Sequence, residues 1–79
     1  MYIRIYRRAE NHTSPQIQTL EVNIDMNDKV SYVKSENLSK IVLFKLFAAV
    51  QVAVLDGFGD VRDADIGRFL QIGNRAGNL

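Results

Sequence analysis

Cysteine and tryptophan are missing from this chain of 79 residues, and proline and histidine occur once each. Without cysteine the chain can form neither a disulfide nor a thiolate metal site, so a fold this small depends on packing or on oligomerisation. The single histidine, His12, stands beside Pro15 in a predicted loop, and the Gly57-Phe58-Gly59 segment lacks the spacing and the lysine of a phosphate-binding loop. We therefore predict no catalytic residues and no enzyme activity.

An excess of charge of one sign is also missing. Ten lysine and arginine residues oppose nine aspartate and glutamate residues, which leaves a net charge of +1. This balance lacks the basic excess typical of nucleic-acid-binding domains. At 47% apolar and 24% charged residues, the composition is that of a globular domain.

A cluster of carboxylates lies between Asp56 and Asp65, and Asp63, Asp65 and Gly67 resemble the opening of a calcium loop. Such a loop needs an oxygen ligand at its fifth position and an acid at its twelfth, where this chain has Gly67 and Asn74. Acidic residues at a helix start explain the cluster more simply. We predict no metal site and no cofactor.

Alternating apolar residues predict three strands. Ile3 and Ile5 alternate with Tyr2, Arg4 and Tyr6, and the same period returns over residues 20–24 and from residue 30. A loop separates the first two strands, at residues 9–16.

A three-residue turn at 26–28 is the favoured connection of the second and third strands. It sets Ile24 opposite Val30 and Val22 opposite Tyr32, with every apolar residue on one face. A two-residue turn would set Val22 opposite Val33 and mix the faces.

Two helices are predicted after the strands. The run from Ile41 to Leu55 (IVLFKLFAAVQVAVL) has thirteen apolar residues in fifteen, and we expect its helix to begin within 36–39. Asp60 is the predicted N-cap of a second helix over about 61–72. The expected fold is α+β and two-layered, a three-stranded antiparallel sheet followed by a long apolar helix and a short second helix (βββαα). Residues 1–72 form the single domain, and 73–79 form a flexible tail.

The long helix has more apolar surface than its neighbours can cover. Helical spacing places one bulky stripe on the sheet, formed by Leu43, Leu46, Phe47, Val50 and Val54. The opposite surface carries Ile41, Lys45, Ala48, Ala49 and Val52, with Phe44, Gln51 and Leu55 at its flank. The predicted second helix is about 18 Å long, whereas the long helix is nearly 30 Å long, so the second helix covers only part of that surface.

This excess of apolar surface predicts a protein partner, and the favoured partner is a second copy of the chain, in a homodimer. The expected interface residues are Ile41, Phe44, Ala48, Val52 and Leu55. The predicted function is that of a small non-enzymatic accessory or regulatory protein that acts by protein–protein interaction. One alternative stays open, in which the 56–60 loop, Phe58 and the tail complete a monomeric core.

A second function is also open, the binding of single-stranded nucleic acid by the first strand. Aromatic rings stack on unpaired bases while guanidinium groups hold phosphates, and the residues concerned are Tyr2, Arg4, Tyr6, Arg7 and Arg8. The competing interpretation is a set of cross-strand pairs with Glu21 and Asp25.

No membrane role is expected, because the apolar run is shorter than the roughly 20 residues of a span and contains Lys45. The first ten residues alternate and do not resemble a secretory signal, so we expect a cytoplasmic protein.

Overall fold

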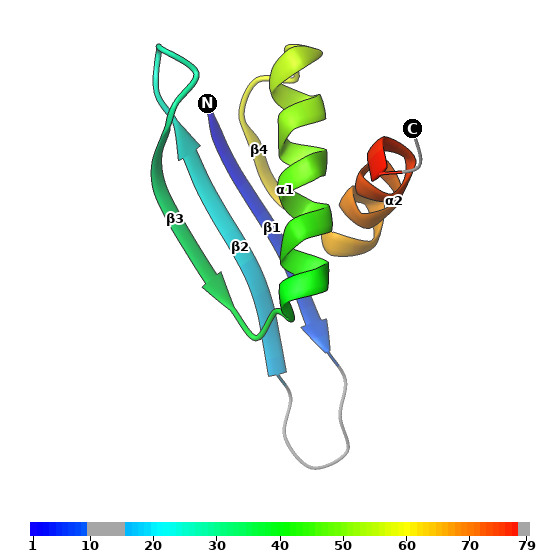
Figure 1. Cartoon of the computed structure of the whole chain (residues 1–79). Helices are drawn as coiled ribbons and strands as arrows, with labels where there is room; N and C mark the ends of the chain where they lie inside the picture. The colour runs from blue at the N-terminus through cyan, green and yellow to red at the C-terminus, as the bar shows by residue number, and fades with distance from the viewer. Residues whose placement is uncertain (10–15, 78–79) are drawn as a thin grey trace.

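A computed structural model describes residues 1–9 and 16–77, and it shows a four-stranded sheet with two helices on one face (Figure 1). The elements are β1 (Tyr2–Ala9), β2 (Gln16–Ile24), β3 (Val30–Glu36), α1 (Lys40–Leu55), β4 (Val61–Asp65) and α2 (Ile66–Gly77). The strand order in the sheet is β3-β2-β1-β4. The α+β class, with a sheet and two helices, is confirmed. The loop predicted at 9–16, with His12 and Pro15, lies largely outside the described residues.

The predicted order of three strands followed by two helices is wrong, because residues 61–65 form a fourth strand instead of the first turns of a helix. β4 pairs in parallel with β1, and the main-chain amide of Tyr2 donates a hydrogen bond of 2.8 Å to Asp60 Oδ1 at the start of β4. Asp60 therefore holds the start of β4 against β1 and is not the N-cap of a helix. Short strands of this kind are stabilised by a neighbour rather than by their own propensity.

The second helix starts at Ile66, five residues later than predicted, and Asp65 caps it. The Gly67 amide donates a hydrogen bond of 2.7 Å to Asp65 Oδ1, the contact expected of an N-cap carboxylate. The helix continues to Gly77, so it includes residues 73–77, which the sequence pattern assigns to the tail.

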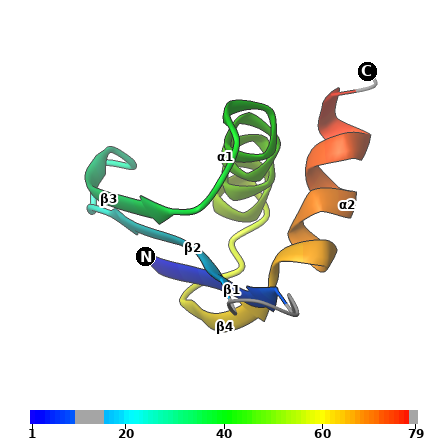
Figure 2. The same cartoon turned by 90° about the horizontal axis from the view of Figure 1, so that it is seen from below.

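The path of α1 follows from the sheet topology. β3 and β4 both run parallel to β1 and lie at opposite edges of the sheet, and parallel strands need a crossover connection. α1 is that crossover and lies over the middle strands, with β3 off to one side (Figure 2). Every residue of β3 is exposed, those on the helix side because α1 does not cover them and the others because they lie on the outer face.

The core lies between β1, β2 and the two helices, and Ile66 and Phe69 of α2 are almost completely buried in it. Ile3 and Ile5 of β1 are fully buried, which confirms the alternation predicted for this strand. Leu46 and Val50 of α1 are buried as well, and the rest of the predicted stripe (Leu43, Phe47 and Val54) packs partly buried against the same core. α1 begins at Lys40, one residue after the expected range, and Ser39 within that range is its N-cap, because the Val42 amide donates to Ser39 Oγ at 3.2 Å.

The hairpin of β2 and β3 has the predicted three-residue turn. Ile24 lies opposite Val30, and the Asp25 amide donates to the Lys29 carbonyl at 2.8 Å. Asp28 is in the left-handed region with φ 60°, a conformation that aspartate tolerates and that this turn requires.

The register predicted beyond this turn is wrong. Val22 lies opposite Val33, and Tyr32 lies opposite Asn23, because an irregularity near Ser31 shifts the pairing by one residue. The Ser31 hydroxyl donates to the Asn23 carbonyl at 3.1 Å and accepts from Asn23 Nδ2 at 2.9 Å. This bulge turns Tyr32 to the outer face of the sheet and leaves Val30 and Val33 on the helix side.

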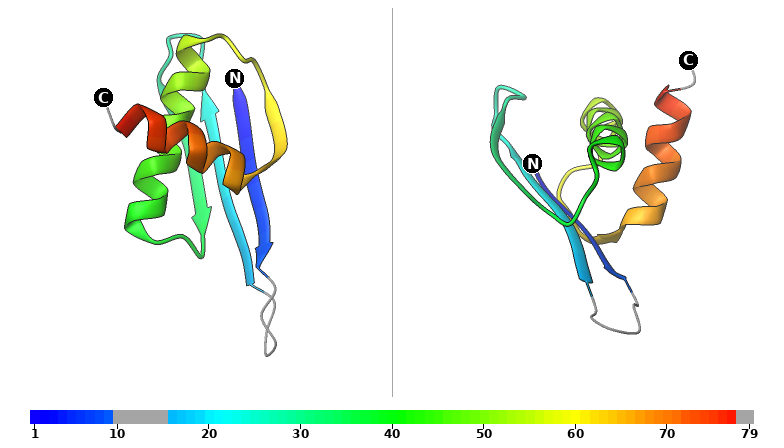
Figure 3. Two further views of the ribbon diagram at one scale, coloured as in Figure 1. Left: turned by 90° about the vertical axis from the view of Figure 1, so that its right-hand side faces the viewer. Right: turned by 60° about the horizontal axis from the view of Figure 1, so that its bottom comes forward.

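α2 crosses α1 instead of running along it (Figure 3). Gly73 is buried at the crossing, where a Cβ atom would overlap the Lys45 carbonyl oxygen and lie 2.9 Å from its carbon. Ala49 and Ala53, one and two turns further along α1 on the side of Lys45, are fully buried. Small residues therefore set the close approach of the two helices.

We expect Gly73→Ala to lower the free energy of unfolding by about 1 to 3 kcal/mol, because overpacking a close backbone contact outweighs the helix-propensity gain of about 1 kcal/mol. Urea denaturation measures the change. Gly67→Ala is the matched control in the same helix, since its nearest atoms are the side-chain ends Asp65 Oδ1 and Arg7 Nη2. A Gly73→Ala protein as stable as the Gly67→Ala control would contradict the close contact between Gly73 and the backbone of Lys45.

Candidate interaction surface

The side of α1 that faces away from the sheet carries a stripe of apolar residues, which we call the outer stripe. Ile41, Phe44 and Leu55 are 71%, 76% and 84% exposed, and Ala48 and Val52 are half-buried beside them. Their spacing along the helix places all five within one sector of the surface, about 21 Å long. The structure therefore places the five predicted interface residues on one exposed face of α1.

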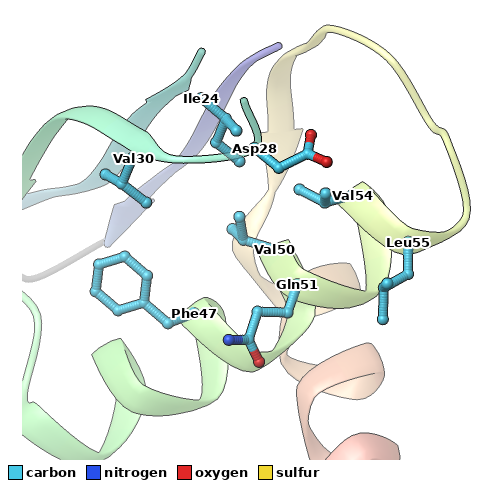
Figure 4. A pocket seen from close by; sticks show the side chains of 8 residues that line it. All are labelled: Ile24, Asp28, Val30, Phe47, Val50, Gln51, Val54 and Leu55. Carbon is cyan, nitrogen blue, oxygen red and sulfur yellow. The ribbon is translucent and has the colours of Figure 1, made fainter. Parts of the chain in front are cut away.

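A groove adjoins the outer stripe on the side of β3. It has a volume of about 590 Å³ and separates α1 from the turn of the β2–β3 hairpin, as Figure 4 shows. Its lining residues are Ile24, Asp28, Val30, Phe47, Val50, Gln51, Val54 and Leu55. The groove exists because α1 lies over the middle of the sheet and leaves β3 uncovered, so the sequence pattern of either element alone does not reveal it.

A second hollow, of about 450 Å³, adjoins the C-terminal end of α1 on the side of α2. It is lined by Val52, Asp56, Phe58, Ile72, Arg75 and Ala76. Phe58 itself is 45% exposed. Among the described residues, the loop after α1 thus leaves the outer stripe uncovered in a single copy.

The outer face of the sheet carries Tyr2, Arg4 and Tyr6, as the alternation predicts, and the bulge adds Tyr32. Arg7 points to the other face, where its Nη2 atom lies 3.9 Å from Asp65 Oδ1, so it is not part of this set. The backbone of Arg8 belongs to β1, while its side chain is not described.

Acidic partners balance two of the basic residues of this outer face, Arg4 and Lys34. Arg4 lies opposite Glu21 in the register, and its Nε atom is 3.6 Å from Asp63 Oδ1. Lys34 Nζ is 3.3 Å from Glu36 Oε1, a contact that raises the pKa of the Lys34 ammonium above its ordinary value. The predicted cross-strand pairing with Glu21 is confirmed, whereas Asp25 lies in the hairpin turn and hydrogen-bonds to main-chain amides there.

Tyr2 is held among charged neighbours on the same face. The guanidinium carbon of Arg62 is 5.1 Å from the centre of the Tyr2 ring. Partial desolvation raises the pKa of the Tyr2 phenol above its ordinary value, and a hydrogen bond to Glu21 and the charge of that carboxylate raise it further. The Tyr2 ring is thus engaged with residues of its own chain.

Comparisons with protein-family models, with curated protein sequences and with solved structures find no match for this chain. Within residues 1–9 and 16–77, no three histidine, aspartate or glutamate residues lie together in a way that could hold a metal ion. No helix in this part of the chain is long and apolar enough to cross a membrane. The surface chemistry described above is therefore the guide to function.

Proposed function

We propose that the protein is a small non-enzymatic interaction module that self-associates through the outer stripe of α1. The observation that supports the proposal is the exposure of three large apolar side chains, at 71%, 76% and 84%, on one face of one helix. A helix of a monomeric domain normally turns its apolar face to the core and a polar face to solvent. Contiguous exposed apolar surface is typical of protein interaction sites.

The free energy gained by burying the outer stripe and the free-energy cost of association are of comparable size. Fully burying one large apolar side chain contributes about 1.5 to 3 kcal/mol, so six such side chains in two copies, each about three-quarters exposed, contribute roughly 7 to 14 kcal/mol. Association costs about 4 to 15 kcal/mol in lost freedom of motion. A reversible dimer is expected from these terms, and one charge placed in the stripe is sufficient to abolish it.

A dimer leaves other surfaces of each copy available for a further macromolecule. The exposed strand β3 and the groove beside it are apolar enough, through Val30, Phe47 and Val54, to bind a second protein. An accessory or regulatory protein that acts by occupying a surface of its target fits this arrangement. The groove and the stripe share Leu55.

Ile41→Asp and Phe44→Asp test the proposed interface. Either charge opposes burial of the stripe, so we expect the wild type to be dimeric at micromolar to millimolar concentration and both variants to be monomeric in sedimentation equilibrium. Ile41 lies in the first turn of α1, where a carboxylate favours the helix, so loss of the dimer by Ile41→Asp is not loss of the fold.

Met26→Asp is the matched control, because Met26 is apolar and fully exposed but lies in the hairpin turn, away from the stripe. This variant should sediment as the wild type does. Circular dichroism establishes that all variants remain folded. A wild type that is monomeric throughout the concentration range, with unchanged variants, would refute the proposal.

A second candidate function is the binding of single-stranded nucleic acid on the outer face of the sheet. The presence of Tyr2, Tyr6 and Tyr32 on one open face favours it, since bases stack on such rings. The ion pairs of Arg4 and Lys34 with acidic residues oppose it, because phosphate would have to displace them.

Titration with short labelled oligonucleotides at two salt concentrations discriminates between the two functions. The neutralised basic residues lead us to expect no saturable binding at moderate salt, and only weak association at low salt. Saturable binding with a steep salt dependence, lost in Arg4→Gln, would instead support the nucleic-acid function.

A further inference from the structure

We propose that α1 pairs antiparallel with α1 of a second copy, about a two-fold axis that passes beside Ala48. This inference rests on the proposed self-association and adds its direction and register. Three features of the helix support it: the spacing of its exposed residues, their symmetry about Ala48, and the distribution of its charges.

The residues on this face of α1 follow the spacing of a helix-pairing seam. Successive positions are three and four residues apart in alternation, and the residues at these positions are Ile41, Phe44, Ala48, Gln51 and Leu55. Apolar residues at this spacing keep one narrow stripe aligned with a facing helix. Gln51 is the one polar member, and its place beside the groove lets its amide remain hydrated.

The stripe is symmetric about its smallest residue. Ile41 and Leu55 each lie seven residues from Ala48, and Phe44 and Val52 each lie four residues from it. Antiparallel pairing about Ala48 therefore sets Ile41 against Leu55 of the second copy and Phe44 against Val52. Ala48 faces its own equivalent at the axis, where two methyl groups allow the helices to approach closely.

This register also gives the largest side chain a matching site. Phe44 enters the space between Ala48, Gln51, Val52 and Leu55 of the second copy, four residues arranged as the hole that receives a knob in paired helices. Because the axis is two-fold, the same contact forms twice. A parallel pairing instead stacks Phe44 on Phe44, which leaves the smaller residues without large neighbours.

The charges of α1 select the antiparallel direction. Lys40 and Lys45 lie in its N-terminal half, and Asp56 follows its C-terminal end. In parallel paired helices, a residue beside the seam faces the residue five positions later in the other helix. Parallel pairing would therefore bring Lys40 of each copy near Lys45 of the other. Antiparallel pairing separates the lysines and places them near the negative C-terminal end of the opposite helix.

The hollow at the C-terminal end of α1 lies where the antiparallel arrangement needs space. Its lining includes the apolar Val52 and Phe58 and the charged side chains of Asp56 and Arg75. In the proposed dimer this hollow faces the N-terminal half of the opposite α1. Ile41 of the second copy fills its apolar part, and Lys45 of the second copy extends towards Asp56.

Disulfide cross-linking tests the direction and the register, because the chain has no cysteine of its own. Ile41→Cys and Leu55→Cys proteins are mixed, left to exchange subunits and oxidised mildly. Antiparallel pairing predicts a mixed disulfide that joins one Ile41→Cys chain to one Leu55→Cys chain. It also predicts little cross-linking of either protein alone, since equivalent positions then lie about 21 Å apart.

Two further single-cysteine proteins complete the test. Ala48→Cys should cross-link to itself, because its equivalents meet at the axis. Met26→Cys, fully exposed and away from the stripe, reports the rate of random collision. The mixed cross-link should form about tenfold or more faster than that background, given the high effective concentration within a complex.

The outcomes separate the direction of pairing from self-association itself. Self-cross-linking of Ile41→Cys and of Leu55→Cys, without the mixed product, would show a parallel pair and overturn this inference while the proposed dimer stands. A dimer in sedimentation that gives no cross-link above the Met26→Cys background would place the contact elsewhere and also overturn it. A monomeric wild type would refute the proposed function as well.

Discussion

The constraint on which the structure depends is the position of a nearly all-apolar helix that must connect the two edges of one small sheet. As the crossover between β3 and β4, α1 passes over β1 and β2 and buries Leu46 and Val50 there. α2 covers a second side, where Gly73 allows close contact with the backbone of Lys45. A third side has no cover within the described residues of one copy. The exposed outer stripe is therefore a consequence of topology as much as of composition.

The same constraint accounts for the groove and for β3. A single helix over the middle strands leaves the helix side of one edge strand open, and the bulge at Ser31 keeps Val30 and Val33 on that side. The other face of the sheet is different in character, because its basic residues Arg4 and Lys34 are paired with acidic residues. Apolar contact, rather than net charge, is consequently the stronger basis for a functional proposal.

Features that depend on local periodicity could be predicted from the sequence. The alternation of Ile3 and Ile5, the stripe around Leu46 and the position of Ile41, Phe44 and Leu55 on one helix face all follow from a fixed period of two or 3.6 residues. β4 could not be predicted in this way, because residues 61–65 (VRDAD) have little strand propensity and are held by the free edge of β1 and by the Tyr2–Asp60 hydrogen bond. The Ser31 bulge and the groove likewise depend on contacts between distant residues. The sequence pattern predicts three acids at the start of a helix, and each has a different role. Asp60 accepts a hydrogen bond at the sheet edge, Asp63 forms an ion pair with Arg4, and Asp65 caps α2.

The central claim is that another copy covers the outer stripe in solution, and side-chain solvent exposure measured by NMR tests it most directly. A soluble paramagnetic agent broadens the signals of exposed methyl and ring groups, and Met26 supplies the fully exposed reference. The account predicts that Ile41, Phe44 and Leu55 are protected at high protein concentration and become as accessible as Met26 on dilution. Accessibility equal to that of Met26 at every concentration would contradict it.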